Sequence, residues 1–220
     1  MKIDMHCHSF YSRDSICSPK LLIDTAIKKG LDGIAITDHN TTKAWDELIE
    51  YANTKNFLLI LGEEIKIKEN NKTIGEILAY FINKEIDPKG KTGEEIIKEI
   101  HSQGGIAIIA HPYHRKKPFK LLEKYIKIVD GVEIFNSRSQ TKNGNKKSFL
   151  LLEKYDLPFV AGSDSHTLWE IGNAYIEINN IQDIKNDILN KKIKVTGKQS
   201  PFILQIFSPI AKLIYWFKSL

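Results

Sequence analysis

Cysteine, arginine and long apolar runs are all scarce in this 220-residue chain. Its two cysteines, Cys7 and Cys17, are too few for a disulfide framework, which excludes the small disulfide-rich secreted domains and favours a reducing compartment. The N-terminus opens on the strand-like segment MKIDMHCH, without the basic and apolar regions of a secretory signal. We therefore expect a cytoplasmic protein.

Charge of one sign is not in large excess either. Lysine and arginine total 32 against 27 aspartates and glutamates, which gives a formal net charge of +5. Lysines dispersed over helix faces usually solvate a surface, whereas a nucleic-acid footprint needs clustering on one face. The composition, with 42% hydrophobic and 27% charged residues, is typical of a globular protein and excludes wholesale disorder.

Short apolar runs alternate with helical patterns along the chain. Helix signals include Ser18-Pro19 at one start and the capping-box spacing of Thr92 and Glu95 at another. The apolar runs are mostly continuous, as in parallel strands covered on both faces, and their repetition favours a closed α/β barrel or a doubly wound sheet. The expected strands are 2–6, 33–37, 58–62, 76–82, 106–110, 131–135, 158–162 and 174–178.

The last residues differ in composition from the rest. We expect one compact domain over residues 1–197, followed by an apolar segment over residues 198–220. Residues 201–220 read PFILQIFSPIAKLIYWFKSL, and polar residues and a proline interrupt the apolar ones, so a membrane-spanning helix is not expected. We expect this segment to pack on the domain or at an interface. Membrane contact through 201–220 is not the favoured reading, and a homo-oligomer stays open.

Histidines and carboxylates recur where the expected strands end. His6 and His8 close the first strand, and the alternation of side chains places both on one side. Later strands are followed by Thr37-Asp38-His39, Gly62-Glu63-Glu64, His111-Pro112 and Gly162-Ser163-Asp164-Ser165-His166. In an α/β barrel these ends meet at the C-terminal mouth, where active sites lie. This pattern of ligand types predicts a multinuclear metal site.

These motifs, in this order, resemble those of the PHP (polymerase and histidinol phosphatase) superfamily, from the first residues to about residue 197. The resemblance implies a distorted (β/α)7 TIM-like barrel with two or three divalent metal ions at the C-terminal mouth. It also implies a phosphoesterase, because most stand-alone members are phosphoesterases.

The resemblance further implies a ligand set. Glu64 would bridge a first metal, shared with His6, His8 and Asp164, to a second metal that His111 also holds. A third metal would lie between His39, His166 and Asp14. With Glu76 added, the expected ligands are His6, His8, Asp14, His39, Glu64, Glu76, His111, Asp164 and His166.

Glu76 stands where many members carry a histidine in a Gly-His pair. Its carboxylate is an oxygen donor that suits a harder ion, so Mn²⁺, Mg²⁺ or Fe²⁺ is favoured over Zn²⁺. A salt-bridged carboxylate at a strand end is the alternative for Glu76. Glu63 competes with Glu64 for the bridging role, but alternation along the strand predicts that Glu63 faces the other side.

Three further polar residues follow the expected strands. Asp38 is expected to hold an imidazole in one tautomer. Glu133 and Asn136 end the expected strand 131–135, where a functional role and an ordinary loop position are both open.

The three arginines of the chain flank these motifs. Arg13 lies beside Asp14, Arg115 follows His111-Pro112, and Arg138 follows the expected strand 131–135. Arginine offers a bidentate fork to phosphate, so we predict that Arg13, Arg115 and Arg138 bind the substrate phosphate, with exposed loop arginine as the alternative.

We therefore predict a metal-dependent phosphoric ester hydrolase that acts on a small phosphorylated metabolite, such as a nucleotide, by attack of a metal-bridging hydroxide. The expected catalytic residues are Glu64, Asp164, His111 and Arg138. Two alternatives stay open: a hydrolase that trims the 5′ ends of oligonucleotides, and a non-catalytic phosphate- or RNA-binding barrel.

Overall fold

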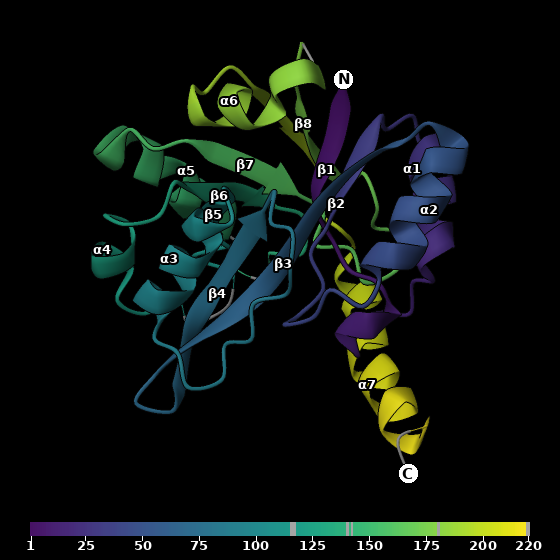
Figure 1. The fold of residues 1–220 in the computed structure, drawn as a ribbon, viewed down its shortest axis with the longest axis horizontal. Helices are drawn as coiled ribbons and strands as arrows, with labels where there is room; N and C mark the ends of the chain where they lie inside the picture. Colours follow the sequence, from purple (N-terminus) through teal and green to yellow (C-terminus); the bar gives the residue numbers. More distant parts are fainter. Residues whose placement is uncertain (115–117, 140, 142, 180, 219–220) are drawn as a thin grey trace.

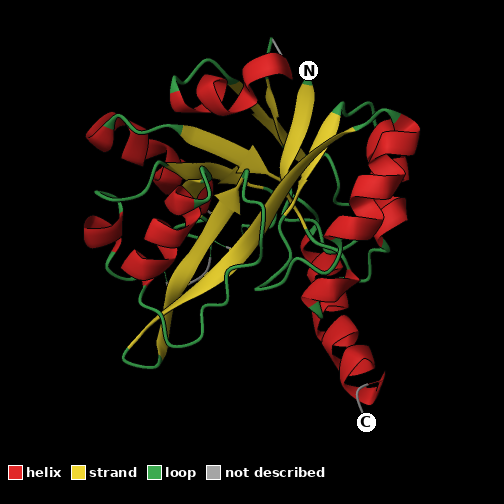
Figure 2. Ribbon diagram, viewed as in Figure 1, coloured by secondary structure: helices red, strands yellow, loops and turns green. Residues whose placement is uncertain are grey.

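The computed structural model describes residues 1–114, 118–139, 141, 143–179 and 181–218. Within them the chain forms a mixed α/β fold whose single sheet curls into a nearly closed barrel with helices outside it (Figures 1 and 2). The described strands are β1 (Lys2–Cys7), β2 (Gly33–Ile36), β3 (Leu58–Glu69), β4 (Lys72–Tyr80), β5 (Ile106–Ile109), β6 (Gly131–Asn136), β7 (Phe159–Gly162), β8 (Ala174–Glu177) and β9 (Lys194–Gly197).

Helices connect most of these strands, and the signals at two of their starts are confirmed. Pro19 is the first helical residue after Ser18, and Thr92 and Glu95 form both hydrogen bonds of a capping box. The described helices are α1 (Pro19–Lys28), α2 (Trp45–Lys55), α3 (Gly93–Ser102), α4 (Leu122–Tyr125), α5 (Gly144–Tyr155), α6 (Ile184–Leu189) and α7 (Phe207–Lys218), with the 3₁₀ helices η1 (Phe10–Ser12), η2 (Ile181–Asp183) and η3 (Phe202–Ile206).

The strand order along the sheet is β7-β6-β5-β4-β3-β2-β1-β8-β9. A parallel bridge between Cys7 and Ser165 brings the end of β1 to the segment after β7. There the His8 amide donates to the Ser165 carbonyl at 3.0 Å, and the Ser165 amide donates to the His6 carbonyl at 3.3 Å. The α/β, TIM-like barrel expected from the sequence is therefore confirmed, and this bridge closes it.

The strand pattern within the barrel departs from a strict (β/α)7 repeat. The pairs β3–β4 and β4–β5 are antiparallel, whereas β1–β2, β2–β3, β5–β6 and β6–β7 are parallel. The cause is a hairpin: β3 continues to Glu69, and a two-residue turn at Asn70 and Asn71, with φ of 49° and 60°, sends the chain back as β4. Asparagine tolerates positive φ at both central positions of such a turn. Outside the barrel, β8 pairs antiparallel with β1, and β9 with β8.

The apolar core forms two layers because neighbouring residues of a strand face opposite sides of the sheet. One cluster joins Ala35, Ile60, Leu78 and Ile108 from consecutive strands of the barrel. The other joins their neighbours, such as Ile34, Ile36, Ile77 and Ile109, with helix residues that include Leu22, Leu48 and Ile96. With both faces of the sheet filled by apolar side chains, polar groups are concentrated at the mouth of the barrel.

The C-terminal helix α7 extends away from the body of the domain (Figure 1). Ala211 is buried, but most of the segment's large apolar side chains are exposed. None of the helices in the described part of the chain is long and apolar enough to cross a membrane. The exposed apolar residues of the segment are Phe202, Ile203, Ile206, Ile210, Leu213, Ile214, Tyr215, Trp216 and Phe217.

Candidate metal centre

A cavity of about 370 Å³ opens at the mouth of the barrel, where the segments after β1, β2, β5 and β7 meet β3 and β4. All of its lining residues except Pro209 have polar or charged side chains. The lining residues are Asp14, His39, Glu64, Glu76, His111, His114, Arg138, Asp164, His166, Gln205, Ser208, Pro209 and Lys212.

His6 and His8 lie fully buried at the edge of this cavity, next to two carboxylates. The Nε2 atom of His8 is 3.4 Å from Glu64 Oε2 and 3.3 Å from Asp164 Oδ1. The Nε2 atom of His6 is 3.6 Å and 3.7 Å from the same two oxygens. Both imidazoles therefore direct one nitrogen to the same pair of carboxylates.

Two further groups of donors flank this pair. Asp14 lies between His39 and His166, with each Nε2 atom 3.4 Å from one of its carboxylate oxygens. On the other side, His111 Nε2 lies 2.8 Å from Glu64 Oε1 and 3.6 Å from Glu76 Oε2. The structure thus brings all nine expected ligands to one site, and their assignment as ligands stays a prediction.

The donor atoms are spaced closely enough to share cations. Each of four sets of three donor atoms lies within 4.8 Å of one another. They are His6–His8–Glu64, His6–His111–Asp164, His8–His39–His166 and His39–Glu64–Glu76.

Several of these donors are buried without a hydrogen bond, which tests whether a cation fits the site. Among the described residues, His6 Nε2, His8 Nε2, Glu64 Oε2 and Asp14 Oδ1 have no hydrogen-bond partner. Buried polar atoms are rarely left unsatisfied, and such an atom costs about 1–3 kcal/mol. Nitrogen and oxygen donors that converge in this way satisfy the preferences of divalent cations such as Mn²⁺, Fe²⁺ and Zn²⁺. The residues present therefore fit a metal centre.

The electrostatics of the site differ among its donors. Burial opposes protonation of His6 and His39, but the adjacent carboxylates outweigh it and raise the pKa of both imidazoles well above the usual value, so a cation that binds there must displace protons. Burial and the neighbouring His166 lower the pKa of His8 to about 3, so this imidazole is neutral at neutral pH. Burial opposes ionisation of Glu64, but the adjacent His39 and His6 outweigh it and hold the pKa of Glu64 well below its usual value. Asp164 behaves in the same way beside His6.

Glu133, in the middle of β6, orients two of the histidines. Its Oε1 accepts a hydrogen bond from His6 Nδ1 at 2.9 Å, and its Oε2 accepts one from the His111 amide at 2.8 Å. Asn136 donates to the same Glu133 Oε2 and to Asp164. Glu133 is buried, so these contacts are shielded from water. The role that the sequence leaves open for Glu133 and Asn136 is thus a positioning one.

Asp38 acts on His8 through a serine. Asp38 accepts hydrogen bonds from the Ser9 amide at 2.7 Å, the Ser9 hydroxyl at 2.6 Å and the Ser12 hydroxyl at 2.6 Å. Ser12 Oγ in turn contacts His8 Nδ1 at 2.9 Å and accepts from the His39 amide at 3.1 Å. Because Ser12 donates to Asp38, its oxygen is left to accept a hydrogen bond from the N–H at His8 Nδ1, which leaves Nε2 free for a metal. The sequence did not indicate Ser12.

Two buried acidic residues that the sequence analysis missed hold the loop after β7. Asp4 accepts from the amides of Ser163 at 2.8 Å and Gly172 at 2.8 Å. Glu170 accepts from the amides of His166 at 3.1 Å and Thr167 at 3.0 Å. The Thr-x-x-Glu spacing of residues 167–170 was a usable signal for the second contact.

The backbone is strained at two of the expected ligands. His111 has φ of 25° and Asp164 has φ of 55°, in or near the left-handed region that non-glycine residues rarely adopt. Each such residue costs on the order of 1–3 kcal/mol and persists only where surrounding contacts impose it. Contacts at the mouth, such as the hydrogen bond from the His111 amide to Glu133, hold the backbone in this conformation.

Glu63 faces the opposite side of β3, as alternation predicts. Its Oε2 accepts a hydrogen bond from the Ile86 amide at 3.0 Å, and burial raises its pKa to about 8. Cys7 likewise packs in the apolar cluster beneath the helices. These positions leave Glu64 as the residue of this pair that faces the histidines.

The arginines are placed differently from one another. Arg138 lines the cavity, and its guanidinium contacts Glu170 Oε1 at 3.0 Å and donates to Ser208 at 3.1 Å. Arg13 instead lies over the ring of Tyr215, 5.0 Å from its centroid, and lines a neighbouring cavity. The structure thus does not place Arg13 with Arg138, because Arg13 is the C-cap that follows η1 and the aromatic ring of Tyr215 on α7 holds its side chain. Arg115 lies outside the described residues.

Comparisons with known proteins agree with this architecture. A family model described as the PHP domain matches residues 4–200. An uncharacterized protein of Methanocaldococcus jannaschii is 35% identical over 199 residues, which cover 87% of this chain and 76% of that protein. A 5′-3′ exoribonuclease of Haemophilus influenzae is 24% identical over 248 residues, which cover 75% of this chain and 90% of that enzyme.

A solved structure has the same fold. It is a two-domain protein of Bacteroides vulgatus that contains a predicted PHP-like metal-dependent phosphoesterase. It matches with a TM-score of 0.75 at 19% identity, over 90% of this chain and 65% of the other. At this identity the likeness extends to the fold alone, and the Bacteroides protein is longer than this chain.

Proposed function

Because the chain belongs to the PHP domain family, we propose that it is a metal-dependent phosphoesterase that hydrolyses a phosphate ester of a small metabolite, such as a nucleotide. The observation that carries this proposal is the convergence of histidines and carboxylates on one cavity, with buried donor atoms left unpaired. Such a donor set is typical of sites where several cations lie close together.

The carboxylates of the cavity oppose the binding of a phosphate substrate unless cations are bound. Asp14, Glu64, Glu76 and Asp164 all line it, and their carboxylates would repel the oxygens of a phosphate ester. When bound, divalent cations lower the pKa of water and neutralise charge on the phosphate oxygens. Removal of metal should therefore abolish phosphate binding as well as turnover.

The chain's own residues divide the remaining work. Glu64 lies between the His6–His8 pair and His111, so it would be the residue to contact two cations. Asp164 would help to hold the cation near His6 and His8, and Glu133 fixes the imidazole of His6. Each of these groups holds a donor atom still, and the low reorganisation of a fixed polar site favours the charged transition state.

Among the described residues, Arg138 is the arginine that we assign to the substrate phosphate. It is buried at the cavity wall, where a guanidinium attracts phosphate more strongly than it does in water. Its contacts with Glu170 and Ser208 hold the guanidinium in one orientation. We therefore assign the binding of a phosphate oxygen to the edge of Arg138 that faces the cavity.

The size of the cavity supports a small substrate. Its volume of about 370 Å³ falls at the lower end of the roughly 300–1,000 Å³ that small-molecule sites span. The likeness to a 5′-3′ exoribonuclease is the one observation that favours the second candidate, removal of the 5′ end of an oligonucleotide. Both candidates use the same site and differ only in what extends out of the mouth.

Metal analysis followed by a phosphate-release screen tests the proposal. The screen covers nucleotides, sugar phosphates, histidinol phosphate and short 5′-phosphorylated oligonucleotides, each with Mn²⁺, Fe²⁺, Zn²⁺ or Mg²⁺ added to protein stripped by a chelator. Turnover of mononucleotides above oligonucleotides would support the small-metabolite proposal. Bound metal without turnover of any ester would contradict both and would favour a non-catalytic phosphate-binding barrel.

The variant His8→Ala tests the metal site, and a control variant tests whether the loss of any histidine has the same effect. We expect turnover to fall to background while the circular dichroism spectrum is retained, because His8 Nε2 faces both Glu64 and Asp164. The matched control is His101→Ala: His101 lies on α3 and contacts Asp130 at 2.7 Å on the surface. Full activity of His8→Ala would contradict the metal mechanism.

A further inference from the structure

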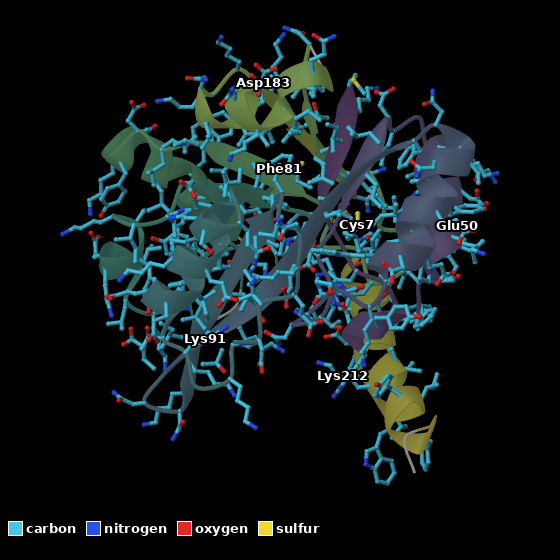
Figure 3. The ribbon with its side chains drawn as sticks, viewed as in Figure 1. Cys7, Glu50, Phe81, Lys91, Asp183 and Lys212 are labelled. Atoms are coloured by element: carbon cyan, nitrogen blue, oxygen red, sulfur yellow. The ribbon has the colours of Figure 1, made fainter. Side chains whose placement is uncertain are left out.

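The PHP domain match ends at residue 200, yet residues beyond it line the cavity. Gln205, Ser208, Pro209 and Lys212 belong to η3 and α7, and their spacing of three, one and three positions places them on one helical face. In Figure 3 the labelled Lys212 lies on α7. One face of the C-terminal segment is therefore a wall of the metal site.

Specific contacts fix this face against the mouth. Ser208 accepts a hydrogen bond from Arg138, and Gln205 donates to the carbonyl of Arg138 at 3.1 Å. Phe207 packs against Trp169 with 5.7 Å between the ring centroids, and Ala211 is buried. The contact of Arg13 with Tyr215 adds a fourth attachment one turn further on. The wall is thus attached at several points rather than by one contact.

Lys212 is the residue of this wall that carries a charge. Its Nζ lies 3.2 Å from Asp14 Oδ2, and its side chain is 60% exposed, so it reaches into the mouth from outside. Within the described lining it is the one lysine, and Arg138 already contacts Glu170. Lys212 therefore supplies a second positive charge, beside that of Arg138, to the described cavity wall.

Asp14 has better partners than Lys212 when cations are present. Each of its oxygens lies 3.4 Å from an imidazole nitrogen, one of His39 and one of His166, in the arrangement of a cation site. A cation held by these three residues would satisfy Asp14 and leave the ammonium of Lys212, on its flexible stem, for another anion. At the mouth of this cavity that anion is the substrate phosphate.

We propose that the C-terminal segment is part of the substrate site and that Lys212 binds a phosphate oxygen of the substrate. This inference rests on the proposed phosphoesterase function and adds a residue outside the family match. An ammonium acts on phosphate as a point charge, so its loss should weaken binding without altering the metal ligands. We expect a decrease in phosphate affinity of about tenfold, typical of a charge-assisted hydrogen bond.

The experiment measures binding of inorganic phosphate to the full chain loaded with Mn²⁺, by calorimetry. The variant is Lys212→Gln, and the matched control is Lys98→Gln, an exposed lysine of α3. We expect Lys212→Gln to raise the Kd for phosphate about tenfold and to raise KM more than it lowers kcat. Lys98→Gln should leave both unchanged.

Two outcomes would overturn the proposal. One is an unchanged phosphate Kd in Lys212→Gln. The other is an altered affinity for Mn²⁺ with no effect on phosphate, which would make Lys212 a partner of Asp14 alone. Failure of the proposed function looks different: the wild type would bind phosphate through Lys212 but hydrolyse no ester. Conversely, ester hydrolysis with the same KM in Lys212→Gln would retain the function and refute the role of Lys212.

Discussion

Gly162 lies where β7 meets β1, and replacing it tests whether barrel closure positions the metal ligands. A Cβ atom at Gly162 would lie 2.3 Å from His6 Cβ and 2.6 Å from His6 N. Carbon atoms in contact are normally separated by about 3.5–4.0 Å, so Gly162→Ala must move His6 by more than about 1 Å. Distances in metal sites are held to about 0.2 Å, so this shift removes His6 from the site.

The expected magnitudes follow from this overlap. Overpacking of this kind costs about 1–3 kcal/mol, which for a chain of this size lowers Tm by roughly 2–12 °C. We expect Gly162→Ala to lower the affinity for Mn²⁺ by at least about tenfold, or to reduce the number of bound ions, in calorimetric titrations. Thermal unfolding in the presence of a chelator measures the loss of stability separately from the loss of metal.

Gly104→Ala is the control for destabilisation alone. Gly104 has φ of 74° and nothing within 4 Å of an added Cβ, and it lies between α3 and β5, away from the cavity. Alanine there is strained by about 1–2 kcal/mol but touches no ligand. Its Tm should fall while its affinity for Mn²⁺ stays at the wild-type value. Wild-type metal affinity and stoichiometry in Gly162→Ala would refute the argument that this contact positions His6.

Three further predictions concern residues around the site. Arg138→Ala should lower the free energy of unfolding in urea by about 3–5 kcal/mol, because it leaves the buried Glu170 without its charged partner. Adding Glu170→Gln should restore part of that loss. A larger loss in the double variant would contradict the pairing of Arg138 with Glu170. Glu133→Gln should weaken Mn²⁺ binding by about 10–100-fold, since Glu133 accepts from His6 on one oxygen and from the His111 amide on the other, and glutamine replaces one of these oxygens by an NH₂ donor. Unchanged binding would exclude the positioning role. Burial raises the pKa of Cys17 to about 12. The thiol of Cys17 in the folded protein is therefore protonated and should not react with a thiol reagent at about pH 8 until urea is added. Because only the thiol of the unfolded chain ionises readily, the free energy of unfolding should fall as the pH rises from about 9 towards 12.

The site was more predictable than the strand pattern because its signals are local. Residue types that bind metals follow apolar runs at His6, His39 and His111, and any fold that gathers strand ends brings them together. Glu76 is the exception. It approaches the cavity because β4 runs antiparallel, so the early part of that strand, not its end, lies at the mouth.

The hairpin that joins β3 to the antiparallel strand β4 could have been predicted from the sequence. Ile65-Lys66-Ile67-Lys68 alternates apolar and charged residues, and Asn70-Asn71 is a two-residue turn with both residues at positive φ. Alternation is typical of a hairpin strand with one face in water, and it distinguishes β3 from the continuous apolar runs of the parallel strands. The strand expected over 58–62 is shorter than β3, which continues to Glu69, because only the continuous apolar run was taken as the strand.

The residues that orient the ligands could not be predicted from the sequence in the same way. Ser12 and Asp4 act through contacts that depend on how loops distant in sequence pack together, such as the contact of Asp4 with the Ser163 amide across 159 positions. Glu170 differs, because its contact with the Thr167 amide is local. Lys212 appeared in the sequence only as an interruption of an apolar segment. Its place at the cavity follows from the docking of α7, which no local pattern specifies.

The backbone contacts that close the barrel involve residues of the expected metal site. The hydrogen bonds that close the barrel join the backbones of the expected ligands His8 and His6 to Ser165, at 3.0 Å and 3.3 Å. The bridge between His39 and Glu64 likewise joins two expected ligands at the mouth. Without cations, neighbouring carboxylates and strained residues oppose these contacts. A ligand that binds only the folded state stabilises it by about 2.7 kcal/mol at a hundred times its Kd. Metal binding should therefore stabilise the closed barrel itself, because the residues expected to bind the cations also make the backbone contacts that close the barrel.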